Sequence, residues 1–339
     1  MTRKLKIAIL GFGNASRAFS KILEAERVNI LSDYNTAIVT TGITTGSHGA
    51  LYNPKGLHLD SIRDYYDANG EFLNPIQMTS MELAESGDYD VLIEATPLNI
   101  HTGQPATDHI KTALKRGKAV ITANKGPIAW YFKELKTLAK DNNCPFFYET
   151  TVMDGTPVFN LVNDTLKMCK VTAVDGILNS TTNFILEELA KGRDYDEVIA
   201  EGRELGFIEA DSAMDIEGYD AAAKLTALLN VLMDADLTPD KINRKGIEDI
   251  DKKDIENASK EGKVIKLICH GDNNEAYVRP TLIDKSDMMA TIDSTSSIVQ
   301  ITTNYMGKLS VIEHDPDLVQ TGYGIFSDLI RVIESTLVN

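Results

Sequence analysis

The residues from Gly206 to Leu225 combine carboxylates and a lysine at a spacing that can do chemistry. The segment reads GFIEADSAMDIEGYDAAAKL, an acidic loop followed by a helical pattern that carries Asp220 and Lys224. Residues four apart share one face of a helix, so this lysine and this carboxylate are expected to meet. Such a group is either a solvated ion-pair surface or a site for a small polar substrate with an amine and an oxygen to be protonated. Only the elements around it can distinguish the two.

Length and composition indicate a globular protein of two domains. The 339 residues exceed what one hydrophobic core usually holds, and contents of 43% hydrophobic and 25% charged residues are ordinary for such a protein. The net charge of −16 argues against nucleic acid or an anionic membrane as a partner, because phosphates would be repelled. A small-molecule substrate is the expectation that remains.

The cysteines and the N-terminus favour a cytoplasmic setting. Cys144, Cys169 and Cys269 are widely spaced and form no CxxC pair, so neither a disulfide framework nor a zinc site is indicated. The apolar run before the first glycine is too short for a signal peptide, and no segment approaches the length of a membrane span.

A glycine-rich turn near the N-terminus predicts a dinucleotide site. The apolar run Lys6–Leu10 reads as a buried parallel strand, and it leads directly into GFGNASRAF and a helical pattern. In that context Gly11 permits the tight turn and Gly13 lets a pyrophosphate approach the helix N-terminus, while Ser16 replaces the third glycine. A plain strand–turn–helix is the competing interpretation. The predicted cofactor residues of the turn are Gly11, Phe12, Gly13, Asn14, Ala15 and Ser16.

The end of the second predicted strand favours NADP(H) over NAD(H). The strand, residues 37–43, is followed by TTGSHG, which has no Asp or Glu to hold the 2′-hydroxyl of an NAD ribose. Ser47, His48 and the later Lys55 are small polar or basic groups suited to a 2′-phosphate. No arginine lies at this position, and His48 reads equally well as an ordinary loop residue.

Further polar residues follow the next two predicted strands, residues 90–95 and 118–122. Thr96 and Pro97 follow the first, and Asn124 and Lys125 follow the second. In open α/β sheets ligands bind outside the carboxyl ends of the strands, so all four are candidate cofactor or catalytic residues. A lysine beside a nicotinamide is a candidate proton carrier, although most lysines are only solvated surface residues.

The second half of the chain reads as an α+β domain. The pattern predicts strands and helices in mixed order, with a hydroxyl-rich turn around Leu178–Asn183. The expected strands are residues 171–177, 264–268, 276–280 and 298–304, and the expected helices are residues 158–166, 184–190, 196–205 and 326–337. We therefore predict a Rossmann-type doubly wound parallel sheet over residues 1–150 and an α+β domain over residues 151–318.

Several motifs together resemble the homoserine dehydrogenases. They are GFGNASRAF, EATPLNI, VITANKGP, YETTVMDGTP, LNSTTNFIL and, most specific, GFIEADSAMDIEGYDAAAKL, and they cover roughly residues 5–230 in the family's order. The resemblance implies an NAD(P)-dependent interconversion of L-aspartate 4-semialdehyde and L-homoserine, a step of threonine and methionine biosynthesis. It also implies a homodimer, and a C-terminal helix, residues 319–339, that packs back on the nucleotide domain.

The resemblance assigns roles to particular residues of this chain. Lys125 and Lys224 fall on the two catalytic lysines, and Gly322 falls near the cofactor. The implied substrate-binding residues are Glu209, Asp215, Asp220, Thr181 and Phe207. The implied monovalent-cation site, usually sodium, falls on Glu149, Val152, Asp154 and Thr156.

The sequence departs from the family pattern in three places. Met153 and Asp154 interrupt a cation loop that normally has more glycine, Ser180 stands for a glycine, and the lead into the last helix is shortened to TGYGIF. No regulatory tail follows that helix, so we expect a short form. The alternatives are a dehydrogenase for another amino-acid semialdehyde or small hydroxy acid, and a nucleotide-binding homologue that has lost turnover.

Overall fold

The computed structural model describes residues 2–204 and 213–336, which belong to two compact units. Unit 1 combines Met1–Phe159 with Asp317–Asn339, and unit 2 is Asn160–Pro316. The boundary lies nine residues beyond the predicted end of the first domain, because residues 150–159 pack with the first unit rather than the second.

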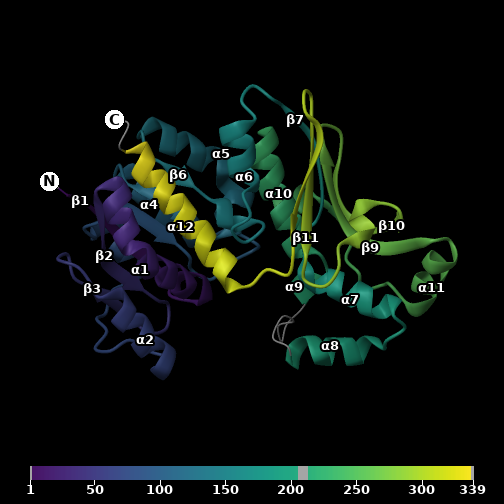
Figure 1. The fold of residues 1–339 in the computed structure, drawn as a ribbon, viewed down its shortest axis with the longest axis horizontal. Helices are drawn as coiled ribbons and strands as arrows, with labels where there is room; N and C mark the ends of the chain where they lie inside the picture. The colour runs from purple at the N-terminus through teal and green to yellow at the C-terminus, as the bar shows by residue number, and fades with distance from the viewer. Residues whose placement is uncertain (1, 205–212, 337–339) are drawn as a thin grey trace. The chain divides into compact units, whose positions relative to one another are not determined.

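Unit 1 is built on a doubly wound sheet with the strand order β3-β2-β1-β4-β5-β6 (Figure 1). All neighbouring strands are parallel except β3, which turns back antiparallel to β2. The chain reverses its direction of travel across the sheet at β1, which pairs with both β2 and β4, and such a switch point is where ligands bind. The strands are Arg3–Leu10, Thr36–Thr44, Ala50–Tyr52, Val91–Glu94, Ala119–Thr122 and Phe146–Phe147 for β1 to β6.

Helices cover this sheet, and two of them, α2 (Leu59–Asn69) and α5 (Lys125–Asp141), were not predicted from the sequence. The polar residues 50–69 form β3 and α2. The sequence of α2 carries few apolar residues, and Leu59 alone is buried in it. The other helices of this part are α1, Asn14–Tyr34; α3, Ser80–Ser86; and α4, Ala106–Lys115.

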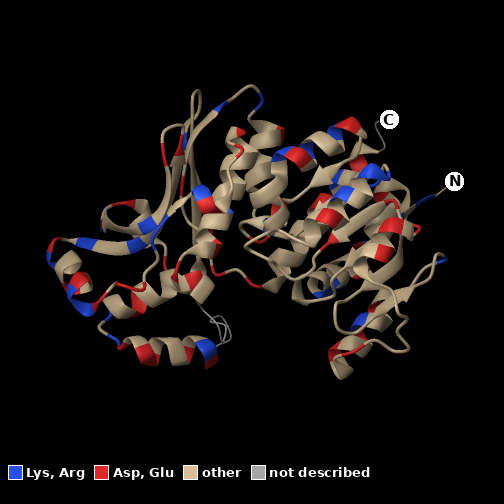
Figure 2. Ribbon diagram, turned by 180° about the vertical axis from the view of Figure 1, so that it is seen from behind, with Lys and Arg blue, Asp and Glu red and all other residues tan. Residues whose placement is uncertain are grey.

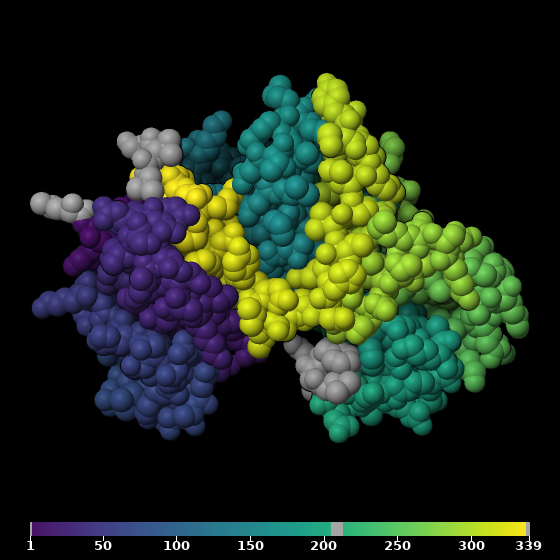
Figure 3. Space-filling view, in the orientation of Figure 1, coloured from purple at the N-terminus to yellow at the C-terminus, as the bar shows by residue number. Residues whose placement is uncertain are grey.

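The C-terminal helix α12, Leu318–Ser335, belongs to unit 1 and packs against α1. Figure 3 shows the two helices, yellow and purple, side by side. The hydrophobic pattern predicts a helix only from Phe326, whereas the C-terminal helix implied by the family resemblance, residues 319–339, agrees with the observed start at Leu318. The glycines of TGYG lie inside α12, where Gly322 approaches α1 so closely that an added Cβ would be 2.6 Å from the backbone nitrogen of Phe19.

Unit 2 contains a second six-stranded sheet, ordered β12-β11-β7-β9-β10-β8 and antiparallel except for the pair β8–β10. Strand β12 was missed by the sequence reading. One sheet face packs on α10, where Gly271 meets the side chain of Leu229 and the Cys269 thiol approaches the Ala221 carbonyl. The strands are Val171–Ile177, Asn243–Arg244, Lys263–Asp272, Ala276–Asp284, Ser297–Thr303 and Gly307–Glu313 for β7 to β12.

The predicted helix at residues 158–166 is only partly an α-helix. Residues 158–166 form a short α-helix, α6 (Val158–Asn160), that continues as a π-helix over Leu161–Thr165. The boundary between the two units falls inside α6. The remaining helices are α7, Ser180–Ala190; α8, Tyr195–Glu204; α9, Ala213–Ile216; α10, Tyr219–Met233; and α11, Lys252–Lys260.

Charged residues and cysteines occur in both units. Acidic and basic residues are both spread over the helices of the two units (Figure 2). All three cysteines are free. Among the described residues, no helix has both the length and the hydrophobicity needed to cross a membrane.

Candidate active site

The glycine turn between β1 and α1 has the geometry that a pyrophosphate needs. Gly11 has φ +89°, and a Cβ there would lie 2.2 Å from the carbonyl oxygen of Ala95, so only glycine fits. Gly13 is different, because nothing lies within 4 Å of a Cβ placed on it. The N-cap residue of α1 is Gly13, so no side chain at this position accepts a hydrogen bond from the first backbone N–H groups of the helix. The open approach and the uncapped helix start fit an anionic group.

The remaining predicted residues of this turn lie around these two glycines. Ser16 is buried and its hydroxyl donates to the Gly11 carbonyl at 2.7 Å, which holds the first turn of α1 against the strand end. The Phe12 side chain is buried against Tyr66 and Phe72, so any contact of Phe12 with a cofactor would come from its backbone. Asn14 and Ala15 open α1, where Asn14 accepts a hydrogen bond from Arg17 at 2.6 Å.

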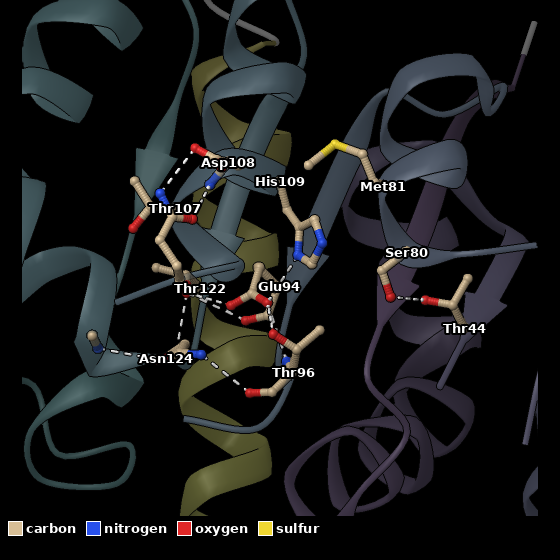
Figure 4. A network of polar contacts seen from close by, with 12 residues as sticks. Thr44, Ser80, Met81, Glu94, Thr96, Thr107, Asp108, His109, Thr122 and Asn124 are labelled. Carbon is tan, nitrogen blue, oxygen red and sulfur yellow. Dashed lines mark hydrogen bonds and ion pairs between the residues drawn. The ribbon is translucent and has the colours of Figure 1, made fainter. Parts of the chain in front are cut away.

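A buried carboxylate ties together the strand ends that carry the other cofactor candidates. Glu94 ends β4 and is fully buried, and its Oε1 accepts hydrogen bonds from the backbone N–H and the hydroxyl of Thr96 (Figure 4). Its Oε2 lies 3.4 Å from the Thr122 hydroxyl, which accepts the backbone N–H of Asn124 at 3.0 Å. Asn124 closes the ring by donating to the Thr96 carbonyl at 3.1 Å. The residues after β4 and β5 are therefore held as one polar assembly.

His109 adds a second titratable group to this ring. Its Nδ1 lies 3.6 Å from Glu94 Oε1, and both side chains are buried (Figure 4). Sequence reasoning missed both residues, since Glu94 reads as one more position in a strand and His109 lies fifteen residues further along the chain.

Lys125 is placed by this assembly. It is the first residue of α5, and Asn124 caps the helix by accepting the Gly126 N–H at 3.0 Å. Gly126 and Pro127 lie in the first turn of α5, where proline is tolerated. Lys125 itself is half-buried.

The region predicted to hold a 2′-phosphate lies beyond β2. His48 packs its ring edge-on against Tyr66 and donates its backbone N–H to the Thr45 hydroxyl. Ser47 and Lys55 are exposed. Arg17, which sequence reasoning did not consider, lies over the ring of Tyr66 and forms an ion pair with Asp67.

Unit 2 contains the second polar cluster, where the end of β7, α9 and α10 come together. The expected pairing of Asp220 and Lys224 is present, with 3.1 Å between Oδ2 and Nζ. Lys224 also donates to the carbonyl of Leu178 at 2.8 Å. Asn179 joins the cluster by donating to Asp215 at 2.7 Å and to Asp220 at 3.0 Å. Its site role was not predicted, because its partners lie 36 and 41 residues away in the sequence.

The surroundings of Asp215 change its acidity. Burial raises the pKa of this carboxyl, and the neighbouring charge of Asp220 raises it further. Hydrogen bonds from Asn179 and Thr181 and the charge of Lys224 act in the opposite direction. Thr181 is itself buried in the first turn of α7. Glu209 and Phe207, the other predicted substrate residues, lie outside the described residues.

The predicted cation loop packs tightly in unit 1. Glu149 is buried and its Oε1 accepts the Phe159 N–H at 2.8 Å. Asp154 accepts the hydroxyl of Thr321 at 2.7 Å, and the carbonyl of Thr156 accepts the Val158 N–H at 2.8 Å. The described residues contain no group of three or more His, Cys, Asp and Glu side chains that could hold a metal ion. A cation in this loop would therefore depend on backbone carbonyls such as that of Val152.

Together the two clusters define a class of protein. A doubly wound sheet with an open glycine turn fits a dinucleotide, and a cluster of two aspartates, an asparagine and a lysine fits a small polar substrate with an amine. This is the organisation of a two-domain oxidoreductase that uses a nicotinamide dinucleotide.

Comparison with known proteins gives the family. Residues 157–330 match the homoserine dehydrogenase family model, and residues 64–149 match the model of the NAD-binding domain of homoserine dehydrogenase. A homoserine dehydrogenase of Methanocaldococcus jannaschii is 33% identical, with 98% of this chain and 99% of that protein covered. The NAD(+)-dependent homoserine dehydrogenase of Pseudomonas canavaninivorans is 32% identical, with 97% and 96% covered. The chain belongs to the homoserine dehydrogenase family, and it is an NAD(P)-dependent oxidoreductase.

Solved structures agree on the fold. A candidate homoserine dehydrogenase of Archaeoglobus fulgidus has a TM-score of 0.88 at 30% identity, covering 97% of this chain and 99% of that one. A hyperthermophilic archaeal homoserine dehydrogenase in complex with NADPH has a TM-score of 0.84 at 26% identity, covering 98% of both chains. The expected combination of a Rossmann-type domain and an α+β domain is thereby confirmed.

Proposed function

We propose that the enzyme interconverts L-homoserine and L-aspartate 4-semialdehyde, with the unit 2 cluster as its substrate site. The observation that carries the proposal is the group formed by Asp215, Asp220, Lys224 and Asn179. Two carboxylates and one ammonium leave this group with a net negative charge when all three are ionised. That charge suits the α-ammonium of an amino acid, which a hydroxy acid lacks.

The residues of the chain have separate tasks in the proposed reaction. Asp215, with Glu209, holds the α-ammonium through charge-assisted hydrogen bonds. Asp220 holds Lys224 through their ion pair. Lys125 is the first choice as general acid for the substrate oxygen, and Lys224 stabilises the charge on that oxygen or relays the proton. A bound nicotinamide would supply or accept the hydride at C4 of the substrate.

Removal of either lysine tests these roles. Lys125→Ala and Lys224→Ala should each lower kcat by about 10²- to 10⁴-fold, the usual contribution of acid–base catalysis, while NADPH binds nearly as before. Turnover is followed by NADPH oxidation with aspartate semialdehyde, and binding by nucleotide fluorescence. Lys140→Ala, an exposed lysine of α5, is the control. A variant with wild-type turnover would remove its lysine from the catalytic group, and an inactive wild-type chain would overturn the function.

We also propose that NADP(H) is preferred over NAD(H). The end of β2 carries threonine and glycine in place of an acidic residue, and Lys55 is exposed on the turn that follows β3. Among the relatives named above, one is NAD(+)-dependent and another was solved in complex with NADPH. Fluorescence titration should give tighter binding of NADPH than of NADH, and Lys55→Ala should weaken only NADPH. Tighter NADH binding by the wild type would reverse the preference.

We further propose a monovalent cation, such as Na+, in the loop of Glu149, Val152, Asp154 and Thr156, and a homodimer paired through the unit 2 sheets. The cation proposal is supported by the buried Glu149 and by the resemblance of YETTVMDGTP to the family's loop. The dimer proposal is supported by the family resemblance and by a row of polar side chains across one face of the unit 2 sheet. A cytoplasmic location fits the three free cysteines.

A further inference from the structure

Asn179 makes more contacts in the substrate cluster than its place in the sequence suggests. It precedes α7 as the helix N-cap, and its Oδ1 accepts the Thr182 N–H at 2.8 Å. Its Nδ2 donates to Asp215 Oδ1 at 2.7 Å and to Asp220 Oδ2 at 3.0 Å. The side chain is buried.

These contacts fix the orientation of the amide. A carboxylate only accepts hydrogen bonds, and a backbone N–H only donates them. The amide therefore has to present its NH2 group to the aspartates and its oxygen to α7. Both amide hydrogens are then used to bridge two carboxylates that would otherwise repel each other, and the same Oδ2 of Asp220 also faces Lys224.

The helix behind Asn179 is itself anchored. One turn further along α7, Asn183 donates to the carbonyls of Ile292 and Ser294 at 3.3 and 3.1 Å. The Asn183 Oδ1 accepts a hydrogen bond from the buried Lys266 at 2.8 Å, and Lys266 also donates to the Ile292 carbonyl. The buried side chains of Asn183 and Lys266 thus tie the start of α7 to β9 and to the segment before β11, which holds Asn179 beside the aspartates.

We propose that Asn179 is a positioning residue of the substrate site, which holds the carboxylates of Asp215 and Asp220 at the separation and orientation that amine binding and Lys224 require. It acts through these side chains and not on the reacting atoms. The inference rests on the proposed function for its kinetic readout, but the bridge itself belongs to the substrate-free protein.

Two substitutions separate this role from helix capping. Asn, Asp and Ser are similarly good N-cap residues, so Asn179→Asp and Asn179→Ser both keep an acceptor for the Thr182 N–H. The aspartate replaces the donating NH2 by a third acceptor oxygen, and the serine removes the bridge without adding a charge. Asn230→Ser is the matched control, because Asn230 is also buried and bonds Leu237 at the far end of α10.

The expected result is a change in substrate binding and in its pH dependence. KM for homoserine should rise at least about tenfold in both variants, while the Kd for NADPH stays within about twofold of wild type. Burial and the charge of Asp220 raise the pKa of Asp215. The hydrogen bond from Asn179 lowers this pKa, as do the charge of Lys224 and the hydrogen bond from Thr181. Loss of the hydrogen bond from Asn179 should therefore move the acid limb of the kcat/KM profile to higher pH. The shift should be larger in Asn179→Asp than in Asn179→Ser, because only the aspartate adds a negative charge beside Asp215.

The outcomes distinguish failure of this inference from failure of the proposed function. Wild-type KM and an unmoved acid limb in both variants, with any loss of Tm matched by Asn230→Ser, would overturn it. If the wild type does not oxidise homoserine at all, the proposed function fails instead. Carboxyl NMR titration of Asp215 in the substrate-free chain then decides the matter, because the pKa should rise in Asn179→Ser and not in Asn230→Ser.

Discussion

Asp215 is half-buried and lies beside Asp220, and this predicts how activity depends on pH. Burial and the neighbouring carboxylate raise its pKa, so it becomes protonated at a higher pH than an ordinary aspartate. Only the ionised form binds an ammonium through charge. As the pH falls through this raised pKa, kcat/KM for homoserine should therefore fall, mainly through a rise in KM.

Asp215→Asn gives the test at the residue level. The variant should lower kcat/KM by about 10- to 100-fold near neutral pH, the usual worth of a hydrogen bond to a charged group, and it should lose this acid limb. Steady-state kinetics across the pH range measure both. Asp249→Asn, an exposed carboxylate of unit 2, is the control. An acid limb that persists in Asp215→Asn would assign it to another group.

At this scale the sequence predicts local pairs well and distant ones poorly. The ion pair of Asp220 and Lys224 follows from helix periodicity alone, because the residues are four apart. The bridge through Asn179 and the ring around Glu94 depend on which strand ends and helices meet in the folded chain. No spacing along the sequence contains that information, so the roles of Glu94 and Asn179 were not predicted.

The docking of helix α12 depends on two glycines that meet backbone to backbone. A Cβ on Gly324 would lie 2.2 Å from the Thr150 hydroxyl and 2.8 Å from the Cα of Gly155. Backbone at such a distance cannot move aside cheaply. Gly324→Ala should therefore lower the stability of the protein by about 1–3 kcal/mol, as overpacking of a dense interior usually does.

Thermal unfolding of the cofactor-free protein measures this effect. Gly46→Ala is the control, because Gly46 is exposed and nothing lies within 4 Å of a Cβ placed there. That variant should change stability by less than about 0.5 kcal/mol. Equal Tm values for the two variants would show that α12 can shift to accept the extra atom.

Gly322 and Gly324 explain why the hydrophobic pattern places the start of α12 too late. Glycine usually marks a turn, so the run Thr321–Gly324 reads as the lead into a helix that begins later. In the folded protein these residues are helical, and their small size serves the contacts with α1 and with residues 150–155. Helix α2 was missed for the opposite reason, since it lies at the surface with too few apolar residues to show a period. The buried strands β1, β4 and β5 were predicted correctly, because short apolar runs that end in polar residues are typical of buried parallel strands.

At the scale of the whole molecule, one face of the unit 2 sheet carries a row of polar side chains across neighbouring strands. Gln300, Asp175, His270 and Tyr277 stand opposite one another in the register of β11, β7, β9 and β10. His270 Nδ1 lies 2.7 Å from Asp175, and Lys308 of β12 reaches both Asp175 and Gln300. This row lies on the opposite face of β9 from Cys269 and Gly271, which pack on α10.

A twofold dimer through this face would bring the polar row against its own copy. Sedimentation should then give a mass of about twice the 37.3 kDa of the chain. Lys308→Glu removes the cation that faces Asp175 and puts like charges in its place, so it should weaken the dimer by at least about tenfold in Kd. Lys253→Glu makes the same change of charge on the exposed side of α11 and should leave association unchanged. A monomeric wild type would contradict the dimer, and a dimer that is equally stable in both variants would place its interface on another surface of the chain.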